Sequence, residues 1–272
     1  MSRGNLTING LGEVDIAAAH EGTTGTFHVS VAAGQVTFEV DAGVSQSEQD
    51  VIRGGVMIAQ SYFLSTFSWT PTQSVKVIVR SGTNGPIQAQ AQGAQITVYA
   101  GNADWQRFGP GFKRKTLVHE FFHVMQYFLG WIPANQQVTS ALWLLEGSAE
   151  YVGYLAAYAG QGVNSVDQLR GCHQFRVSNG VRIPRLSELE GQGFNDVSRQ
   201  GAPVYSIGYL AAERAAEASG LRSLSTFGLS AATSTWQDAF LRAFGSPLSA
   251  FYDAFEQYRN SWRPPSSYTC AS

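Results

Sequence analysis

The segment KRKTLVHEFFHVMQ (residues 113–126) decides how this chain is interpreted, because it places His119, Glu120 and His123 in an apolar run predicted to be helical over 112–129. Side chains at positions i and i+4 of a helix are separated by about 40° around the axis and about 6 Å along it. Both imidazoles can therefore reach one metal ion. Glu120 lies about 100° round from His119, where its carboxylate would face a water molecule on that ion.

The order His-Glu-x-x-His is a zinc motif, in which the metal lowers the pKa of a bound water to about 7 and the glutamate takes its proton. A catalytic zinc ion has three protein ligands and one open position, so a third donor must exist. A metzincin would supply Gly and His at positions 126 and 129, where this chain has Gln126 and Leu129. The metzincin class is therefore excluded.

A glutamate in a second apolar segment is the candidate third ligand. Glu146 follows Trp143-Leu-Leu in a helix predicted over 139–159, and a carboxylate buried among such side chains is costly unless it is paired or bound to metal. Glu150 follows one turn later on the same face. It is either an ordinary exposed glutamate or the acceptor that fixes the tautomer of a ligand histidine.

The two segments together resemble the gluzincin clan of zinc peptidases, the thermolysin and aminopeptidase N group, and most of all its peptidase MA-like branch. The resemblance implies a thermolysin-like catalytic architecture and one Zn²⁺ ion bound by His119, His123 and Glu146. It also implies that Glu120 is the general base. The likeness covers residues 45 to 262, although only the two zinc segments are sharply specific.

A tyrosine downstream is the candidate oxyanion donor. Ala202–Leu210 is similar to the Tyr-x-x-Gly helix start of aminopeptidase-type gluzincins, whose tyrosine donates a hydrogen bond to the tetrahedral intermediate, and this implies that role for Tyr205. A phenol with a pKa near 10 stays protonated at neutral pH, so the role suits its chemistry. Tyr209 and Tyr151 are alternative donors. Tyr205 could also be an ordinary core tyrosine with no catalytic role.

One departure from the clan concerns substrate binding. Its aminopeptidases carry a Gly-x-Met-Glu-Asn strand before the zinc helix, whose glutamate binds the free amine of the substrate. The matching segment here, Ile96–Asn102, has no acidic residue. We expect this strand to pair its backbone with an extended peptide, and we expect an endopeptidase rather than an aminopeptidase.

The pattern along the chain predicts an α+β fold, with an N-terminal mixed β-sheet and helices, the active-site helix, and then a mainly helical C-terminal lobe. The lobes span residues 1–132 and 133–272 and together form one catalytic domain. Period-two alternation predicts strands, and a capping box at Ser45 and Glu48 predicts the first long helix. The strands are expected near 26–32, 35–40, 74–80 and 95–100, and the later helices near 112–129, 139–159, 203–219, 233–244 and 246–262.

Composition excludes several classes of partner. The chain has 272 residues, 44% of them apolar, and a net charge of -2 with lysine only at three positions, so we expect no nucleic-acid partner. No apolar run is long enough to span a membrane. The low charged content of 14% favours a secreted or cell-envelope protein whose leader is absent from this chain. We favour a monomer, although the sequence does not reveal the oligomeric state. Lys113-Arg-Lys115 is a small basic cluster.

The remaining nucleophiles and histidines give weaker signals. Cys172 and Cys270 are either one disulfide of an exported protein or two buried thiols. The pair Cys172-His173 lacks the spacing of a thiol protease. His173 is therefore either a donor at the substrate site or a surface histidine.

The leading interpretation is a zinc-dependent metallopeptidase acting on peptide or protein substrates. A non-proteolytic zinc hydrolase with the same site is one alternative, because fold and metal do not fix the substrate. A catalytically silent, metal-stabilised binding module is another. A structural zinc site usually has four protein ligands and no open position, and this disfavours the silent module.

Overall fold

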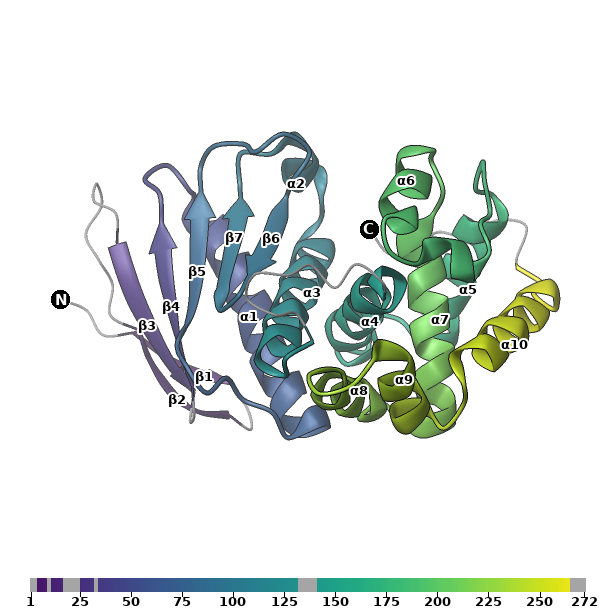
Figure 1. The fold of residues 1–272 in the computed structure, drawn as a ribbon. Coiled ribbons are helices and arrows are strands. Elements are labelled where there is room, and N and C mark those ends of the chain that lie inside the picture. The colour runs from purple at the N-terminus through teal and green to yellow at the C-terminus, as the bar shows by residue number, and fades with distance from the viewer. Residues whose placement is uncertain (1–3, 9–10, 17–24, 32–33, 132–140, 265–272) are drawn as a thin grey trace. The chain divides into compact units, whose positions relative to one another are not determined.

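The computed structural model describes residues 4–8, 11–16, 25–31, 34–131 and 141–264. The chain divides into two compact units, Met1–Phe128 and Leu129–Ser272 (Figure 1). In the described residues the first unit combines β-sheet with helices and the second is helical, so the predicted α+β class is confirmed. The boundary predicted after residue 132 lies outside the described residues.

The first unit contains a five-stranded mixed sheet with the order β3-β4-β5-β7-β6. Strands β4, β5 and β7 are parallel, whereas β3 and β6 are antiparallel to their neighbours. The strands are β3 (Gly25–Val31), β4 (Gly34–Val40), β5 (Val75–Arg80), β6 (Ala89–Gln92) and β7 (Gln95–Tyr99), and a separate hairpin joins β1 (Gly4–Ile8) to β2 (Leu11–Ile16).

The place of β7 in the sheet corrects one expectation. The segment Ile96–Asn102, expected to pair its backbone with a substrate, forms most of β7, which pairs with β5 on one side and β6 on the other. Both sides of this strand are occupied, so the expectation is wrong. Strand order depends on pairings between distant segments, which local alternation of apolar and polar residues does not encode. The strand at this edge of the sheet is β6.

Helix α1 (Gln46–Phe67) begins where the sequence predicts and packs on the zinc-motif helix. Ser45 caps it by accepting a hydrogen bond from the backbone N–H of Glu48, with N and Oγ 3.2 Å apart. At Gly55 the helices approach so closely that a Cβ atom would lie 2.7 Å from Cβ of Leu117. Short helix α2 (Ala103–Arg107) and long helix α3 (Pro110–Phe128) complete this unit in the described residues.

The basic cluster read from the sequence is largely buried. Lys113 and Lys115 are only 7% and 4% exposed. Nζ of Lys113 lies 2.7 Å from a carboxylate oxygen of Glu48, whose other oxygen accepts a hydrogen bond from the indole N–H of Trp105 at 2.7 Å. This buried group of three side chains joins α1, α2 and α3, and it fixes the start of the zinc-motif helix.

The second unit is a set of helices around α4 and α7, which pack closely together. The predicted helices over 139–159, 203–219, 233–244 and 246–262 are present. In chain order the elements are α4 (Leu142–Tyr154), the π-helical turn η1 (Leu155–Ala159), α5 (Val166–Ser178), the short 3₁₀ helix η2 (Leu186–Leu189), α6 (Gly193–Arg199), α7 (Val204–Ser219), α8 (Ser223–Ala231), α9 (Trp236–Phe244) and α10 (Leu248–Asn260).

Helices α2, α5, α6 and α8 have no counterpart among the sequence predictions. Helix α5 buries only a few of its side chains and is polar on average, so its apolar periodicity is weak. Its N-terminus nevertheless carries a capping box, in which Ser165 and Gln168 each bond the other's backbone N–H. This capping box was the feature of the sequence that could have predicted the start of α5. In the described part of the chain, no helix is both long and apolar enough to cross a membrane.

The state of Cys172 bears on whether the two cysteines form a disulfide or are buried thiols. Cys172 on α5 is buried and takes part in a disulfide. The only other cysteine of the chain, Cys270, lies outside the described residues. The reading of Cys172 as an unpaired buried thiol is therefore wrong.

The buried pair of Lys113 and Glu48 generates a stability prediction. Lys113→Met should lower the free energy of unfolding by about 3 kcal/mol, because removing one partner leaves a largely buried carboxylate without its counter-charge. The double variant Glu48→Gln with Lys113→Met should recover most of this loss, since the amide introduced at position 48 can still accept from Trp105. Urea denaturation of the two variants and the wild type measures both values. A Lys113→Met variant as stable as the wild type would contradict the prediction.

Candidate metal centre

Helix α3 holds its two histidines rigidly because most of its other faces are buried. Phe121 and Phe122 pack against Phe63 of α1, with ring centroids 5.8 Å apart in each pair. The remaining face carries His119, which is 7% exposed, and the half-buried His123. The aromatic contacts thus fix the rotation of the helix about its axis and with it the direction of the imidazoles.

The two imidazoles converge through their Nε2 atoms, which lie 3.1 Å apart. The rings are nearly perpendicular, at 82°, with centroids 4.7 Å apart. Two imidazole ligands on a tetrahedral zinc ion, with Zn–N bonds of about 2.0–2.1 Å, have their nitrogens about 3.3 Å apart. The pair in α3 therefore has the spacing that one tetrahedral ion requires.

A carboxylate completes the donor set. Glu146 lies on α4 and is half-buried, directly after the buried residues Trp143, Leu144 and Leu145. One ligand atom from each of His119, His123 and Glu146 lies within 4.8 Å of the other two. Among the described residues, these three form the only such group of three or more His, Cys, Asp or Glu side chains.

The other two predicted carboxylates are both buried. Glu120 is 8% exposed and follows His119 on α3. Glu150 is 7% exposed and lies one turn after Glu146 on α4. The reading of Glu150 as an ordinary exposed glutamate is therefore wrong, and its role toward a histidine stays a prediction.

Of the three candidate tyrosines, only Tyr205 is exposed. It lies in the first turn of α7, 45% exposed, with its ring edge-to-face against Phe194 of α6 at 5.4 Å. Tyr209 is fully buried, and its burial raises the pKa of its hydroxyl well above the usual value. Tyr151 is 7% exposed and packs edge-to-face on Tyr209 at 5.2 Å. Exposure therefore favours Tyr205 as the residue that a substrate could reach.

A glycine pair joins the helices that carry Glu146 and Tyr205. A Cβ atom on Gly147 of α4 would lie 2.3 Å from the carbonyl carbon and oxygen of Gly208 on α7. Backbones can come this close only where neither residue has a side chain. Because Glu146 precedes Gly147 and Tyr205 precedes Gly208 by about one turn, this contact sets the spacing of the two backbones that bear them.

His173 is a core residue, so both readings of it from the sequence are wrong. It is fully buried, its Nδ1 atom lies 3.1 Å from Oγ of Ser206, and its ring stacks on that of Tyr209 at 3.8 Å. It contributes to the packing between α5 and α7. A histidine placed in this way cannot meet a substrate from solvent.

In the sequence, Gln126 is only a departure from the metzincin pattern, but in the structure it contacts His123 directly. Its side chain is fully buried, and its Oε1 atom lies 2.6 Å from Nδ1 of His123. The sequence could have revealed this contact, because residues three apart on a helix are neighbours and Gln126 follows His123 by three positions.

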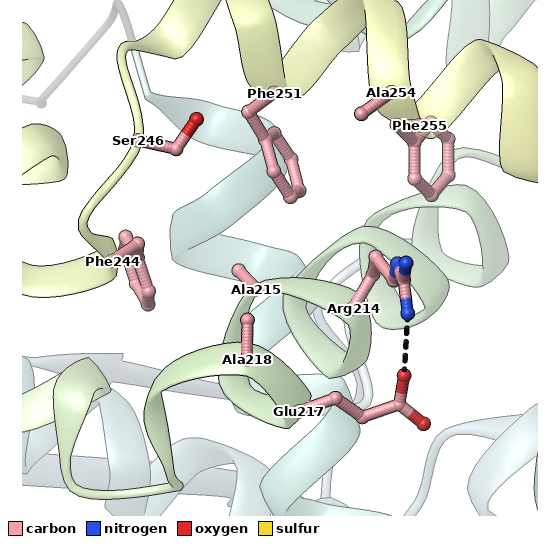
Figure 2. Close-up of a pocket in the computed structure, with 9 residues that line it drawn as sticks. All are labelled: Arg214, Ala215, Glu217, Ala218, Phe244, Ser246, Phe251, Ala254 and Phe255. Carbon is pink, nitrogen blue, oxygen red and sulfur yellow. Dashed lines mark hydrogen bonds and ion pairs between the residues drawn. The ribbon is translucent and has the colours of Figure 1, made fainter.

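A cavity in the second unit lies apart from these residues. It has a volume of about 260 Å³ and is bounded by α7, α10 and the end of α9 (Figure 2). Its walls include Phe244, Phe251 and Phe255, and an ion pair between Arg214 and Glu217, 3.3 Å apart, lies beside it. Ala215 in its lining is ten residues beyond Tyr205, or about 15 Å along the helix axis. The cavity contains none of the predicted site residues.

Comparisons with known proteins bear on the fold. No protein-family model and no curated protein matches the sequence. Aminopeptidase A of Legionella pneumophila has a TM-score of 0.51 at 15% identity, over 81% of this chain and 26% of its own. An M1 zinc metallopeptidase of Deinococcus radiodurans has a TM-score of 0.50 at 17% identity, over 96% of this chain and 61% of its own. The chain therefore shares its fold with parts of these longer zinc-peptidase and aminopeptidase structures.

The glycine contact between α4 and α7 generates the second prediction. Gly208→Ala would place a methyl carbon 2.8 Å from the carbonyl oxygen of Trp143 and 2.9 Å from Cα of Gly147. The helices must then separate, which should lower the free energy of unfolding by about 1–3 kcal/mol. Thermal or urea unfolding measures this loss.

Gly228→Ala is the matched control. Gly228 lies within α8, and its added methyl would meet the side chains of Leu129 at 3.1 Å and Trp131 at 3.7 Å. At 3.1 Å the neighbouring leucine needs to shift by only a few tenths of an ångström, and alanine favours a helix over glycine by about 1 kcal/mol. We expect this variant to keep its stability within about 1 kcal/mol. Equal effects of the two substitutions would contradict the assigned role of the Gly147–Gly208 contact.

Proposed function

We propose that this chain is the catalytic region of a zinc-dependent peptidase, with one Zn²⁺ ion bound by His119, His123 and Glu146. The observation that carries the proposal is the convergence of the two Nε2 atoms at 3.1 Å in a group with Glu146. Without a cation or a proton between them, two imidazole lone pairs would face each other in a mostly buried place. A bound cation removes this repulsion.

The chemistry of the donors favours zinc. Two imidazole nitrogens and one carboxylate form a set that zinc commonly binds, whereas calcium and magnesium prefer oxygen ligands alone. Three protein ligands leave one coordination position open, as catalytic zinc sites do. When bound, the ion would supply Lewis acidity, which lowers the pKa of water and polarises a carbonyl.

Three side chains of the protein have the remaining roles, which are proton transfer, stabilisation of the oxyanion and orientation of a ligand histidine. Glu120 takes a proton from the attacking water at its carboxylate and later passes it to the leaving amine. Tyr205 donates a hydrogen bond to the oxygen of the tetrahedral intermediate. Glu150 accepts the second N–H of a ligand histidine and thereby fixes its tautomer. The burial of Glu120 and Glu150 and the exposure of Tyr205 support these roles.

The strand beside the zinc-motif helix is the proposed place for the substrate backbone. Strand β6 ends the sheet and contacts α3. In the described part of the chain no strand pairs with its outer side, so its backbone N–H and C=O groups can hydrogen-bond an extended peptide. This assigns to β6 the role that the sequence suggested for Ile96–Asn102.

We further propose that the enzyme cleaves internal bonds. Residues 81–100, which include β6 and both of its flanking turns, contain no acidic side chain. A free N-terminal amine would therefore find no counter-charge along this edge. Cleavage at chain ends is the competing possibility, because the Legionella protein of similar fold is an aminopeptidase.

We also propose a secreted or cell-envelope location. The disulfide at Cys172 supports this, because disulfides persist in oxidising compartments. The low charged content of the chain is consistent with the same environment.

The mechanism predicts different effects for a base and for a ligand. Glu120→Gln should retain zinc and lose activity by at least about 100-fold, since general base catalysis contributes about 10²–10⁴-fold. His123→Ala should lose both zinc and activity. Elemental analysis of purified protein, together with peptide cleavage with and without a chelator, measures these effects. A Glu120→Gln variant as active as the wild type would contradict the mechanism, and zinc without any chelator-sensitive turnover would favour the silent binding module.

The endopeptidase proposal predicts that a free N-terminus on the substrate is not required for cleavage. In a diverse peptide library, N-acetylated peptides should be cleaved at internal bonds about as fast as the same peptides with free amines. Mass spectrometry of the products identifies the bonds cleaved. Stepwise removal of single N-terminal residues, abolished by acetylation, would overturn the endopeptidase proposal and favour an aminopeptidase. Cleavage of amides or esters without cleavage of peptides would favour the non-proteolytic hydrolase.

A further inference from the structure

The amide of Gln126 is a part of the centre that the proposed function does not use. Its Oε1 atom lies 2.6 Å from Nδ1 of His123, and both residues belong to α3. An amide oxygen only accepts hydrogen bonds. At this distance the Nδ1 atom therefore carries a proton and donates it.

The position of that proton determines which nitrogen of His123 is available to a metal. A neutral imidazole has one N–H, so a proton on Nδ1 leaves a lone pair on Nε2. Nε2 is the atom that faces Nε2 of His119 at 3.1 Å. Without an acceptor at Nδ1, both tautomers of the neutral ring would be accessible.

Burial makes this hydrogen bond a firm constraint. Gln126 is 0% exposed, so its oxygen cannot turn toward bulk water. A buried amide oxygen without a donor costs about 1–3 kcal/mol, which favours the single arrangement in which His123 donates to it. Gln126 and His123 lie three residues apart on the same helix, where their side chains are neighbours.

We propose that Gln126 is a positioning residue for the metal centre, which holds His123 in the tautomer and orientation that direct Nε2 at the ion. This inference rests on the proposed zinc site. The supporting partner of a ligand histidine is often a carboxylate or a backbone carbonyl, whereas here it is an uncharged amide. Gln126 therefore orients the ligand without adding negative charge, and Glu146 is the single anionic donor of the predicted three.

Two substitutions of similar size separate orientation from volume. Gln126→Met fills the same space but removes the acceptor, and its zinc affinity should fall about 10–100-fold. Gln126→Glu keeps an acceptor and adds a charge, so its zinc affinity should equal or exceed that of the wild type. Gln60→Met is the matched control, because Gln60 is a half-buried glutamine on α1 in the same unit. The zinc affinity of this variant should equal that of the wild type. Competition with a chromophoric chelator measures the zinc affinity of the wild type and of the three variants.

A measurement on the metal-free wild type tests the hydrogen bond without any variant. Nitrogen-15 NMR at about pH 8 should show Nδ1 of His123 protonated and Nε2 unprotonated. The opposite assignment would overturn the inference, even if Gln126→Met failed to fold. Zinc binding by the wild type with an unchanged affinity in Gln126→Met would overturn this inference alone. A wild-type protein that binds no zinc would overturn the proposed function and this inference with it.

Discussion

Two imidazole nitrogens that face each other across 3.1 Å impose a strong electrostatic demand on a mostly buried helix. Lone pairs cannot be held at that distance in a place that water hardly reaches unless a cation or a proton lies between them. The rest of α3 is arranged around this demand. Phe121 and Phe122 fix the rotation of the helix, and Gln126 fixes the ring of His123.

The second helix pair is held by backbone rather than by side chains. Gly147 and Gly208 let α4 and α7 meet at a distance that any side chain would increase. Side-chain packing can relax after a substitution, whereas contact between two backbones has little freedom to do so. Glu146, the predicted third ligand, lies directly beside this contact and therefore starts from a closely defined backbone position. Catalytic groups need such accuracy.

The parts of this structure that follow local rules were predictable. The i and i+4 spacing of His119 and His123 predicted their convergence, and the cap at Ser45 predicted the start of α1. Features that depend on distant contacts were not. The burial of Lys113 requires Glu48, which is 65 positions away, and the order of β6 and β7 requires knowledge of which strands pair. His173 illustrates the same limit, because nothing near it in sequence indicates that Tyr209 covers its ring.

The edge formed by β6 has a consequence for the behaviour of the protein in solution. An open strand edge is a template on which a second copy of the chain can add its own strand, and proteins often discourage this with lysine or proline. Strand β6 is Ala-Gln-Ala-Gln and contains neither. Its protection is its length, because four residues offer too few backbone hydrogen bonds to stabilise a strand-to-strand dimer. The sheet thus ends in a short edge that is a poor seed for aggregation.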